Sequence, residues 1–309
     1  MNKPHSPLTA ASDTTLTDTF FCADIIKLYR NQLDIDVSLY FKGINNFYLY
    51  QCNQTGYRFY YPKGLDGDGQ FYEAIQHRLG EEYYHKWKFE NQMALDIIKP
   101  ADKVLDIGCG IGNFLEKVKA AEVTGLELNE KAVEVCRQKG LNVVNEMIGD
   151  HALHKPLYYD VVCMFQVLEH IYDVKEFLKD SLKVLKTGGR LVIGVPNNEP
   201  YFQGYNKYAT LNLPPHHMGL WNINVFEKTA GLFNLKIEKF TYDVKGSIRT
   251  HAVLRAKYIA KIKSTGGQYS FIEKLKIMAL CFITIPGAIY KKITKGINGS
   301  LLATILVKM

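Results

Sequence analysis

Glycines and acidic residues near the middle of this chain carry its clearest chemical signal. The segment Asp106-Ile107-Gly108-Cys109-Gly110-Ile111-Gly112 follows a short apolar run. Glycines between a strand and a helix let the backbone approach a ligand closely and turn N–H groups toward it. Glu127 ends the next apolar run, about 20 residues on, where a carboxylate accepts hydrogen bonds from the ribose hydroxyls of an adenosine. Asp150 follows a third run, at the rim where we expect the adenine. These residues predict a site for an adenosine-containing cofactor.

Histidines near two other segments are candidates for proton transfer. Glu169 and His170 follow a further apolar run, and His216 and His217 lie between Pro214 and Met218. An imidazole whose pKa is near neutrality is suited to removing a proton from a sugar or phenol hydroxyl. We therefore predict His170, His216, His217 and Glu169 as candidate catalytic residues. The alternatives stay open: His170 orients its loop by hydrogen bonding, and His216 and His217 pack or form a lid.

Alternating strand and helix patterns between about Asp102 and Tyr242 predict an α/β domain with a parallel sheet and crossover helices. We expect strands at Lys103–Ile107, Val123–Leu128, Leu141–Asn145, Asp160–Phe165, Arg190–Val195, Leu235–Tyr242 and Thr250–Ala256. Helices are expected at Asn113–Ala121, from the N-cap Asn129 to Lys139 with Gly140 at C′, at Val174–Leu185 and at Asn222–Phe233. Gln70 to Ile98 is expected to form a helical lead-in.

Four segments of this region resemble the motifs of class I S-adenosylmethionine-dependent methyltransferases. They are VLDIGCGIGNFLE (Val104–Glu116), VTGLE (Val123–Glu127), YDVVCMFQVLEHI (Tyr159–Ile171) and LKTGGRLVI (Leu185–Ile193), in the order and spacing of that family. The resemblance covers about residues 100 to 245. It implies a Rossmann-like, seven-stranded sheet with a reversed last hairpin, and S-adenosylmethionine as the cofactor.

The same resemblance assigns roles to the cofactor-binding residues. Gly108, Cys109, Gly110 and Gly112 would cradle the methionine end after Asp106, Glu127 would hold the ribose, Leu128 and Asp150 would flank the adenine, and Gln166 would lie near the sulfonium. The alternative is a Rossmann fold that binds NAD. The Gly-x-Gly-x-Gly spacing and the segment Leu168-Glu169-His170 favour the methyltransferase.

Some of the same residues are also candidate ligands of a metal ion. Glu169, His170 and His217 resemble part of the ligand set of small-RNA 2′-O-methyltransferases, in which two acids and two histidines hold Mg²⁺. Gln166 stands where the first acid of that family would be. Because a hard cation prefers charged oxygen ligands, we predict no metal.

The chain ahead of the domain divides into two parts. Residues 1–18 are polar and rich in Ser, Thr and Pro, and we expect them to be disordered. Residues 19–70 are dense in aromatic residues and predict a small β-rich module. This module resembles the cysteine-bearing region ahead of many bacterial surface-glycan and secondary-metabolite methyltransferases, where paired CxxC sites bind zinc. Here Thr55 occupies the position of the second cysteine of the CxxC pair that would begin at Cys52, and Cys22 has no paired cysteine nearby. We therefore predict a degenerate version of this module that binds no zinc.

The methyltransferase domain is predicted over residues 71–258, with an irregular active-site insertion at 197–220. The composition, 47% hydrophobic and 22% charged, is typical of a folded soluble enzyme. Six scattered cysteines without a CxxC pair suit buried, reduced thiols and a cytoplasmic location.

Residues 259–309 predict a basic, amphipathic, helical tail. From Arg255 onward the chain has ten basic residues and one acid, a net charge of +9; since the whole chain carries +7, the part before it carries −2. Two apolar runs, Ile277–Tyr290 and Leu301–Val307, are shorter than the ~20 residues that span a bilayer. Flanking lysines favour peripheral contact with an anionic membrane, at its inner face. The alternative is a helical pair that docks on the domain or on a twin subunit in a homodimer.

The predicted reaction is transfer of a methyl group to a hydroxyl of a sugar or lipid-linked glycan, with transfer to N or C left open. One alternative is a small-molecule phenol methyltransferase of the ubiquinone-pathway type, which Gln166–His170 also resembles. Another is a catalytically idle S-adenosylmethionine-binding partner subunit. A near-neutral body disfavours nucleic acid as a partner.

Overall fold

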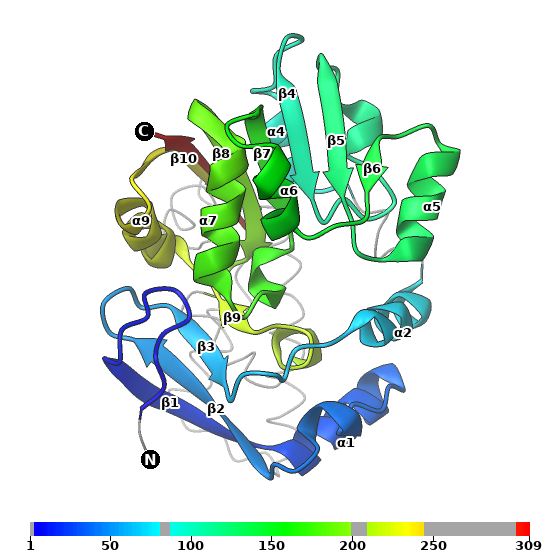
Figure 1. Ribbon diagram of the computed structural model, residues 1–309. Coiled ribbons are helices and arrows are strands. Elements are labelled where there is room, and N and C mark those ends of the chain that lie inside the picture. The colour runs from blue at the N-terminus through cyan, green and yellow to red at the C-terminus, as the bar shows by residue number, and fades with distance from the viewer. Residues whose placement is uncertain (1–2, 81–86, 199–208, 244–300) are drawn as a thin grey trace, which may run out of the picture. The chain divides into compact units, whose positions relative to one another are not determined.

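The computed structural model describes residues 3–80, 87–198, 209–243 and 301–309 (Figure 1). The chain divides into two compact units, one containing Met1–Thr241 with Leu302–Met309 and the other Tyr242–Leu301. Nearly all described residues belong to the first unit, which contains both the module predicted at 19–70 and the strands predicted up to Tyr242. Within the described ranges, no helix is both long and apolar enough to cross a membrane.

Seven strands form the larger sheet, in the order β10-β11-β8-β7-β4-β5-β6. They are β4 (Lys103–Ile107), β5 (Glu122–Leu126), β6 (Val143–Val144), β7 (Tyr159–Phe165), β8 (Leu185–Pro196), β10 (Leu235–Tyr242) and β11 (Leu301–Lys308). β4 pairs in parallel with β5 and β7, and β7 pairs in parallel with β8. The α/β class is therefore confirmed. Its central strands are apolar and buried because helices cover such a sheet on both faces.

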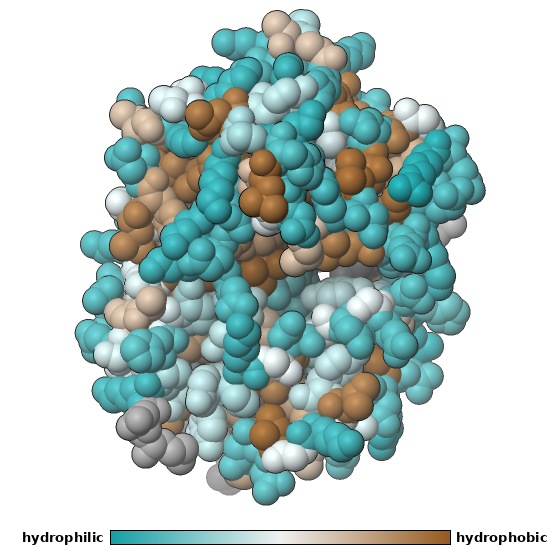
Figure 2. All heavy atoms as spheres, in the orientation of Figure 1, coloured by the Kyte–Doolittle hydropathy of each residue, from teal (hydrophilic) through white to brown (hydrophobic). Residues whose placement is uncertain are grey.

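Helices and short 3₁₀ turns connect the strands. The helices are α2 (Gly69–Leu79), α4 (Phe89–Leu95), α5 (Glu130–Gln138), α6 (Ile148–His154), α7 (Val174–Val184) and α9 (Ile223–Leu232), and the 3₁₀ turns are η2 (Leu115–Lys117), η3 (Leu168–His170) and η4 (Thr210–Asn212). Figure 1 shows α6 and α7 on the same side of the sheet. In α7, Val174, Leu178 and Leu182 recur at helical spacing and are buried. The face of the molecule in Figure 2 is mainly hydrophilic, with several smaller hydrophobic areas.

The prediction for α5 is confirmed at both ends. Asn129 is its N-cap, and the side chain accepts hydrogen bonds from the N–H groups of Lys131 and Ala132. Gly140 follows the helix with a φ of 74°, the left-handed conformation that ends helices.

The helix predicted at Asn113–Ala121 is wrong. Only the turn η2 forms there, and the backbone is extended again at Val118. The N–H of Ala121 donates to the carbonyl of Asp102 at 3.0 Å, next to the start of β4. Phe114 and Leu115 are still buried, so the apolar pattern reflected burial rather than helical periodicity.

The predicted helical tail is wrong for Leu301–Lys308. This run is β11, and it lies between β8 and β10 in the sheet. The N–H of Asp243 donates to Leu301 O and the N–H of Met309 to Asn234 O, so β10 and β11 are antiparallel. Residues 302–306 are almost completely buried, because a strand with a neighbour on each side is covered on both faces. The reversed last hairpin is thus present, but its last strand is Leu301–Lys308; Thr250–Ala256 and Ile277–Tyr290 lie outside the described residues.

The N-terminal module is an antiparallel sheet in the order β1-β2-β3-β9. Its strands are β1 (Thr14–Phe21), β2 (Asn46–Cys52), β3 (Arg58–Tyr61) and β9 (Gly219–Leu220), and α1 (Cys22–Leu33) and η1 (Ser38–Phe41) lie between the first two. Aromatic side chains form its core, with the ring of Phe47 stacked 5.0 Å from Phe20 and 5.5 Å from Phe41. The β-rich character predicted for residues 19–70 is confirmed.

The disorder predicted for residues 1–18 is wrong where the structure describes them. β1 begins at Thr14, and Leu8 is 1% exposed. The Thr14 hydroxyl donates to Pro4 O at 2.9 Å, and Ser6 Oγ accepts from the N–H of Leu8 at 3.3 Å. Serine and threonine, which suggested disorder, here stabilise a turn by bonding to nearby backbone.

The insertion predicted at 197–220 is held against the N-terminal module in the part that is described, 197–198 and 209–220. β9 pairs with β3. Tyr29 Oη donates to Leu213 O at 2.9 Å, and the N–H of Gly67 donates to Pro215 O at 2.8 Å. The module therefore positions the segment that contains His216 and His217.

Candidate active site

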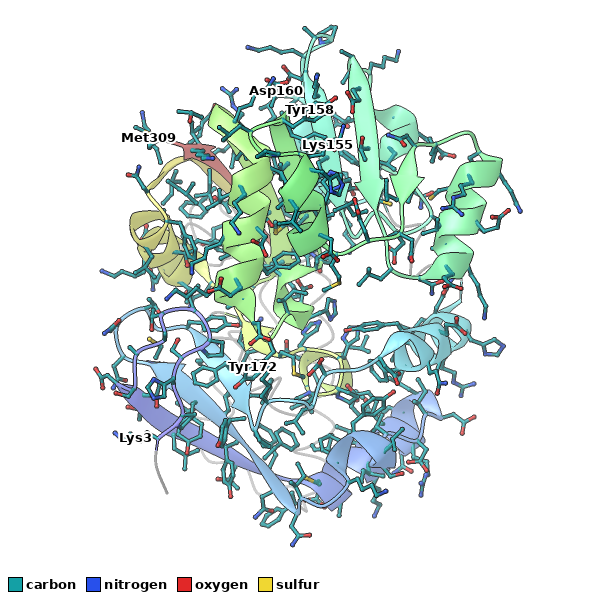
Figure 3. All side chains as sticks on the ribbon, in the orientation of Figure 1. Lys3, Lys155, Tyr158, Asp160, Tyr172 and Met309 are labelled. Atoms are coloured by element: carbon teal, nitrogen blue, oxygen red, sulfur yellow. The ribbon has the colours of Figure 1, made fainter. Side chains whose placement is uncertain are left out.

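The predicted cofactor loop follows β4. Gly108, Gly110 and Gly112 have φ values of 72°, 55° and 81°, in the left-handed region that favours glycine. Gly108 also needs the space, because a Cβ atom there would lie 2.6 Å from Val167 Cγ2. Since Val167 follows β7, the glycine loop and the β7–η3 turn lie in contact. In Figure 3, Asp160 marks the beginning of β7, and Tyr172, which follows η3, lies beyond its other end, where the turn begins.

Glu127 connects this loop to the turn after β5. Its Oε2 accepts from the N–H of Gly110 at 2.9 Å, and its Oε1 accepts from the N–H of Asn129 at 2.8 Å. A carboxylate has about four lone-pair positions, so both oxygens retain capacity for ribose hydroxyls. Leu128 is 57% exposed, and Asp150 is exposed in the first turn of α6. Both lie at the surface, as residues flanking a bound adenine should.

Cys109 supports the loop from the protein interior. Its side chain is buried and packs against the backbone of Gly125 in β5. A Cβ atom at Gly125 would lie 2.6 Å from Cys109 Sγ. Its N–H donates to Leu126 O at 3.0 Å. A thiol–thiol hydrogen bond to Cys136, followed by burial, raises the pKa of Cys109. We infer that Cys109 shapes the loop rather than contacting a ligand through its side chain.

Asp106 is the strongest sign that the loop holds a charged ligand. Its side chain is 2% exposed, and Oδ1 has no hydrogen-bond partner among the described residues. Burial, followed by the charge of Glu127, raises the pKa of Asp106 well above its usual value. A buried carboxyl oxygen without a partner is unfavourable. The ammonium group of an amino-acid ligand would provide the missing partner.

The four predicted catalytic residues lie together. Glu169 and His170 form part of η3, and the N–H of Met218 donates to Glu169 O at 2.8 Å. The ring centroid of His170 is 4.7 Å from that of His216 and 4.9 Å from that of His217. Glu169 Oε1 is 3.9 Å from His170 Nε2. Glu169 and His170 belong to the turn that follows β7, whereas His216 and His217 come from the segment before β9. Val167, in the same turn as Glu169, lies against Gly108 of the cofactor loop.

Burial changes the proton affinity of the cluster. It lowers the pKa of His170 to about 4 and that of His216 to about 3, and it lowers the pKa of His217 well below the usual value. Burial also raises the pKa of Glu169 to about 8. The imidazoles are therefore neutral at pH 7, whereas the Glu169 carboxyl exchanges its proton near neutrality.

Glu90 is a candidate site residue that the sequence analysis missed. It lies in α4, is fully buried and accepts a hydrogen bond from Gln166 Nε2 at 3.1 Å. Its side chain also packs on Gly194 of β8, where a Cβ would lie 2.7 Å from Glu90 Cγ. Gln166 itself has a φ of 57°. The sequence did contain one indication of this role, because Glu90 lies on the same helical face as the apolar residues Met93 and Ala94.

Residues 77–239, more than half of the chain, match the family model described as "Methyltransferase domain". The chain belongs to the S-adenosylmethionine-dependent methyltransferases.

Curated relatives match part of this methyltransferase. The Ubiquinone biosynthesis O-methyltransferase of Proteus mirabilis (strain HI4320) is 34% identical over 103 residues, covering 31% of this chain and 42% of that protein. The enzyme of the same name from Vibrio atlanticus (strain LGP32) is 35% identical over 111 residues, covering 33% and 46%. The chain thus spans less than half the length of these relatives.

Similarity to solved structures supports the fold. A chain from the complex between the Haloferax volcanii Trm112 methyltransferase activator and a methyltransferase has a TM-score of 0.50 and 15% identity, covering 78% of this chain and 97% of that chain. At this identity the likeness shows the fold alone.

The residues of the methyltransferase fit its cofactor. The glycine loop has room for a close approach of ligand to backbone, Glu127 has lone pairs for the ribose, and Asp106 lacks a partner that an ammonium would provide. Bound S-adenosylmethionine supplies an electrophilic methyl group. These three groups would hold it at the carboxyl ends of β4 and β5.

Replacing Asp106 by Asn is expected to change how the stability of the unliganded methyltransferase depends on pH. The pKa of Asp106 is higher in the folded state than in the unfolded state, near 3.8. The folded wild type therefore binds the extra proton, and its stability decreases as pH rises from about 4 through the folded pKa. Asn does not titrate, so the melting temperature of the variant relative to wild type should rise with pH. Thermal unfolding followed by circular dichroism across this range measures it, and a constant difference would contradict the assignment.

Proposed function

We propose that this methyltransferase transfers a methyl group to a hydroxyl oxygen of a sugar or of a lipid-linked glycan. The observation that supports this most is the cluster of Glu169, His170, His216 and His217. Glu169 and His170 share their turn with Val167, which lies against the cofactor loop. Three buried side chains and the half-buried His170, all with hydrogen-bonding capacity, suit an acceptor that presents several hydroxyl groups. Transfer to nitrogen or carbon would not require a group that removes a hydroxyl proton in the same way.

The proposed roles follow from the chemistry of each side chain. Glu169 accepts the proton of the acceptor hydroxyl, since its carboxyl has a pKa near the working pH. The neutral rings of His170, His216 and His217 orient the acceptor. Gln166, whose side chain donates a hydrogen bond to Glu90, directly precedes Val167 in the turn that contacts the cofactor loop. The protein thereby supplies orientation and one proton acceptor, which is what an in-line displacement requires.

A phenol is the second candidate acceptor. The curated relatives carry the name Ubiquinone biosynthesis O-methyltransferase, and a phenol hydroxyl needs the same proton acceptor. A third reading, an idle S-adenosylmethionine-binding partner subunit, predicts cofactor binding without transfer.

The basic segment 259–300 supports a membrane-associated acceptor. Its sequence has lysines at 261, 263, 274, 276, 291, 292 and 295 and one acid, Glu273. Each lysine near an anionic surface contributes about 1 kcal/mol to binding. We therefore include peripheral contact with an anionic membrane in the proposal, restricted to this segment because Leu301–Lys308 is part of the sheet.

One assay with methyl-labelled S-adenosylmethionine separates these readings. The acceptors are free sugars and nucleotide sugars, a glycolipid in anionic or in neutral vesicles, and a catechol. Transfer to a sugar or glycolipid is expected, with faster glycolipid transfer in anionic vesicles. Transfer to the catechol alone would establish the phenol reading, and binding without transfer to any acceptor would favour the idle subunit. Equal rates in both kinds of vesicle would contradict the membrane contact.

A further inference from the structure

The three clustered histidines come from two segments of the chain and meet in one small volume. One ring nitrogen of His170, one of His216 and one of His217 lie within 4.8 Å of one another. The rings of His216 and His217 are stacked, with centroids 4.6 Å apart. Both histidines are 5% exposed. Three imidazole rings this close can each present one nitrogen to a single shared ligand.

Hydrogen bonds to oxygen fix the tautomers of two rings. His170 Nδ1 lies 2.6 Å from His216 O, and His216 Nδ1 lies 2.7 Å from Leu211 O. A carbonyl oxygen only accepts hydrogen bonds, so each Nδ1 carries a proton and donates it. In a neutral ring, Nε2 is then the unprotonated nitrogen, with an electron pair to donate.

The third ring has the same tautomer. His217 Nδ1 lies 3.1 Å from Asn212 Oδ1. The amide of Asn212 is oriented by its Nδ2, which donates to Asn198 Oδ1 at 2.9 Å. His217 Nδ1 is therefore the donor, and Nε2 is again the electron-pair donor.

Glu169 places a buried carboxyl group next to these nitrogens. Its Oε1 is 3.9 Å from His170 Nε2. The side chain is 1% exposed, and Oε2 has no hydrogen-bond partner among the described residues. A cation bound by the imidazoles would stabilise this buried carboxylate.

We propose that His170, His216 and His217 bind one divalent transition-metal ion through Nε2, with Glu169 beside it. Three imidazoles and an open fourth position form a ligand set that Zn²⁺ accepts, and imidazole suits zinc, iron, cobalt and nickel better than magnesium. The oxygens that accept hydrogen bonds from the three Nδ1 groups are the outer partners that metal-bound histidines have. Zn–N bonds of ~2.1 Å place ligand nitrogens about 3.4 Å apart, and here one nitrogen of each ring lies within 4.8 Å of those of the other two, so binding requires the rings to move closer together.

This site departs from the prediction of no metal for a physical reason. That prediction considered a hard cation held by acids, for which Gln166 is a poor substitute. The structure adds a third imidazole, His216, which changes the ligand set to nitrogen. Metal binding itself is independent of the acceptor. With the ion bound, the three rings would orient the acceptor through the ion and not directly. The further role of the ion, making an acceptor hydroxyl near Glu169 more acidic, rests on the proposed function.

Direct metal titration tests the proposal without an activity assay. The full chain, free of any histidine tag, is stripped with a chelator and titrated with Zn²⁺ by calorimetry and with Co²⁺ by visible absorption. One saturable site is expected, with the visible band of cobalt bound by nitrogen. The double variant His216→Gln/His217→Gln should bind Zn²⁺ at least about 100-fold more weakly.

A second group of candidate ligands gives the matched control. Glu146, His151 and His154 also lie close together, but His151 already contacts Glu146 and, at 2.8 Å, the Tyr159 hydroxyl. Glu146→Gln/His154→Gln should leave Zn²⁺ binding unchanged. Binding of S-adenosylhomocysteine by each variant reports that it is folded, and the single variant His217→Gln replaces the double variant if that one does not fold.

Three results would overturn the proposal. They are the absence of saturable Zn²⁺ or Co²⁺ binding by the wild type, loss of binding in the Glu146→Gln/His154→Gln control but not in the His216→Gln/His217→Gln variant, and tighter binding of Mg²⁺ than of Zn²⁺. A methyltransferase that binds Zn²⁺ at the three histidines but transfers no methyl group to any acceptor would refute the proposed function and leave the metal site intact.

Discussion

Replacing Glu127 by alanine is expected to weaken the binding of S-adenosylhomocysteine by at least about 100-fold. The carboxylate would accept two ribose hydrogen bonds, and charge-assisted hydrogen bonds contribute about 1.5–3 kcal/mol each, so ~3 kcal/mol or more is lost. The change also removes the acceptor of the Gly110 and Asn129 N–H groups, which order the loop. Isothermal titration calorimetry measures the dissociation constant.

Glu130→Ala is the matched control for this experiment. Glu130 is also acidic and nearby, but it lies in the first turn of α5 and is exposed. Its replacement should leave the affinity within about twofold of wild type, because an exposed acid contributes little. If Glu127→Ala bound the ligand as tightly as Glu130→Ala, the ribose assignment would have to be abandoned.

Replacing Glu169 by glutamine is expected to lower kcat about 100- to 10,000-fold, the contribution of one positioned proton acceptor. Gln has nearly the same size, and the backbone carbonyl that accepts from the Met218 N–H remains. The affinity for S-adenosylhomocysteine should therefore stay close to that of wild type. Steady-state kinetics with the acceptor identified by the labelled-methyl assay, combined with calorimetry, separates the two quantities.

Glu176→Gln controls for the loss of a negative charge near this turn. Glu176 is exposed in the first turn of α7 and pairs with Lys179 at 2.8 Å. Its replacement should change neither kcat nor ligand affinity. A Glu169→Gln variant with wild-type kcat and only a shifted melting temperature would show that Glu169 has a structural role instead.

The cofactor loop and most of the sheet were predictable because their signals are local. Gly108, Gly110 and Gly112 are adjacent in sequence to the strand that they follow, and each has the positive φ for which glycine is needed. Asn129 caps its helix through N–H groups two and three residues away. Interactions of this kind depend on a few neighbouring residues, so the order of residues is enough to predict them. The failure at Asn113–Ala121 shows the limit, since apolar spacing there served burial in a turn.

Tertiary structure decided everything that depends on contacts between distant segments. The apolar run Leu301–Val307 suits a membrane interface and a buried strand equally well. It forms the strand β11 because it pairs between β8 and β10 in the folded sheet. Glu90 becomes a candidate site residue because α4 brings it to Gln166.

The histidine cluster illustrates the same division. The sequence determined that His170, His216 and His217 have suitable chemistry, but 46 residues separate His170 from His216. Pairing of β9 with β3, and the bond from Met218 to Glu169, bring the two segments together. Side-chain types are read directly from a sequence, whereas their convergence depends on the folded path of the chain and on the burial that fixes which nitrogen of each ring donates an electron pair.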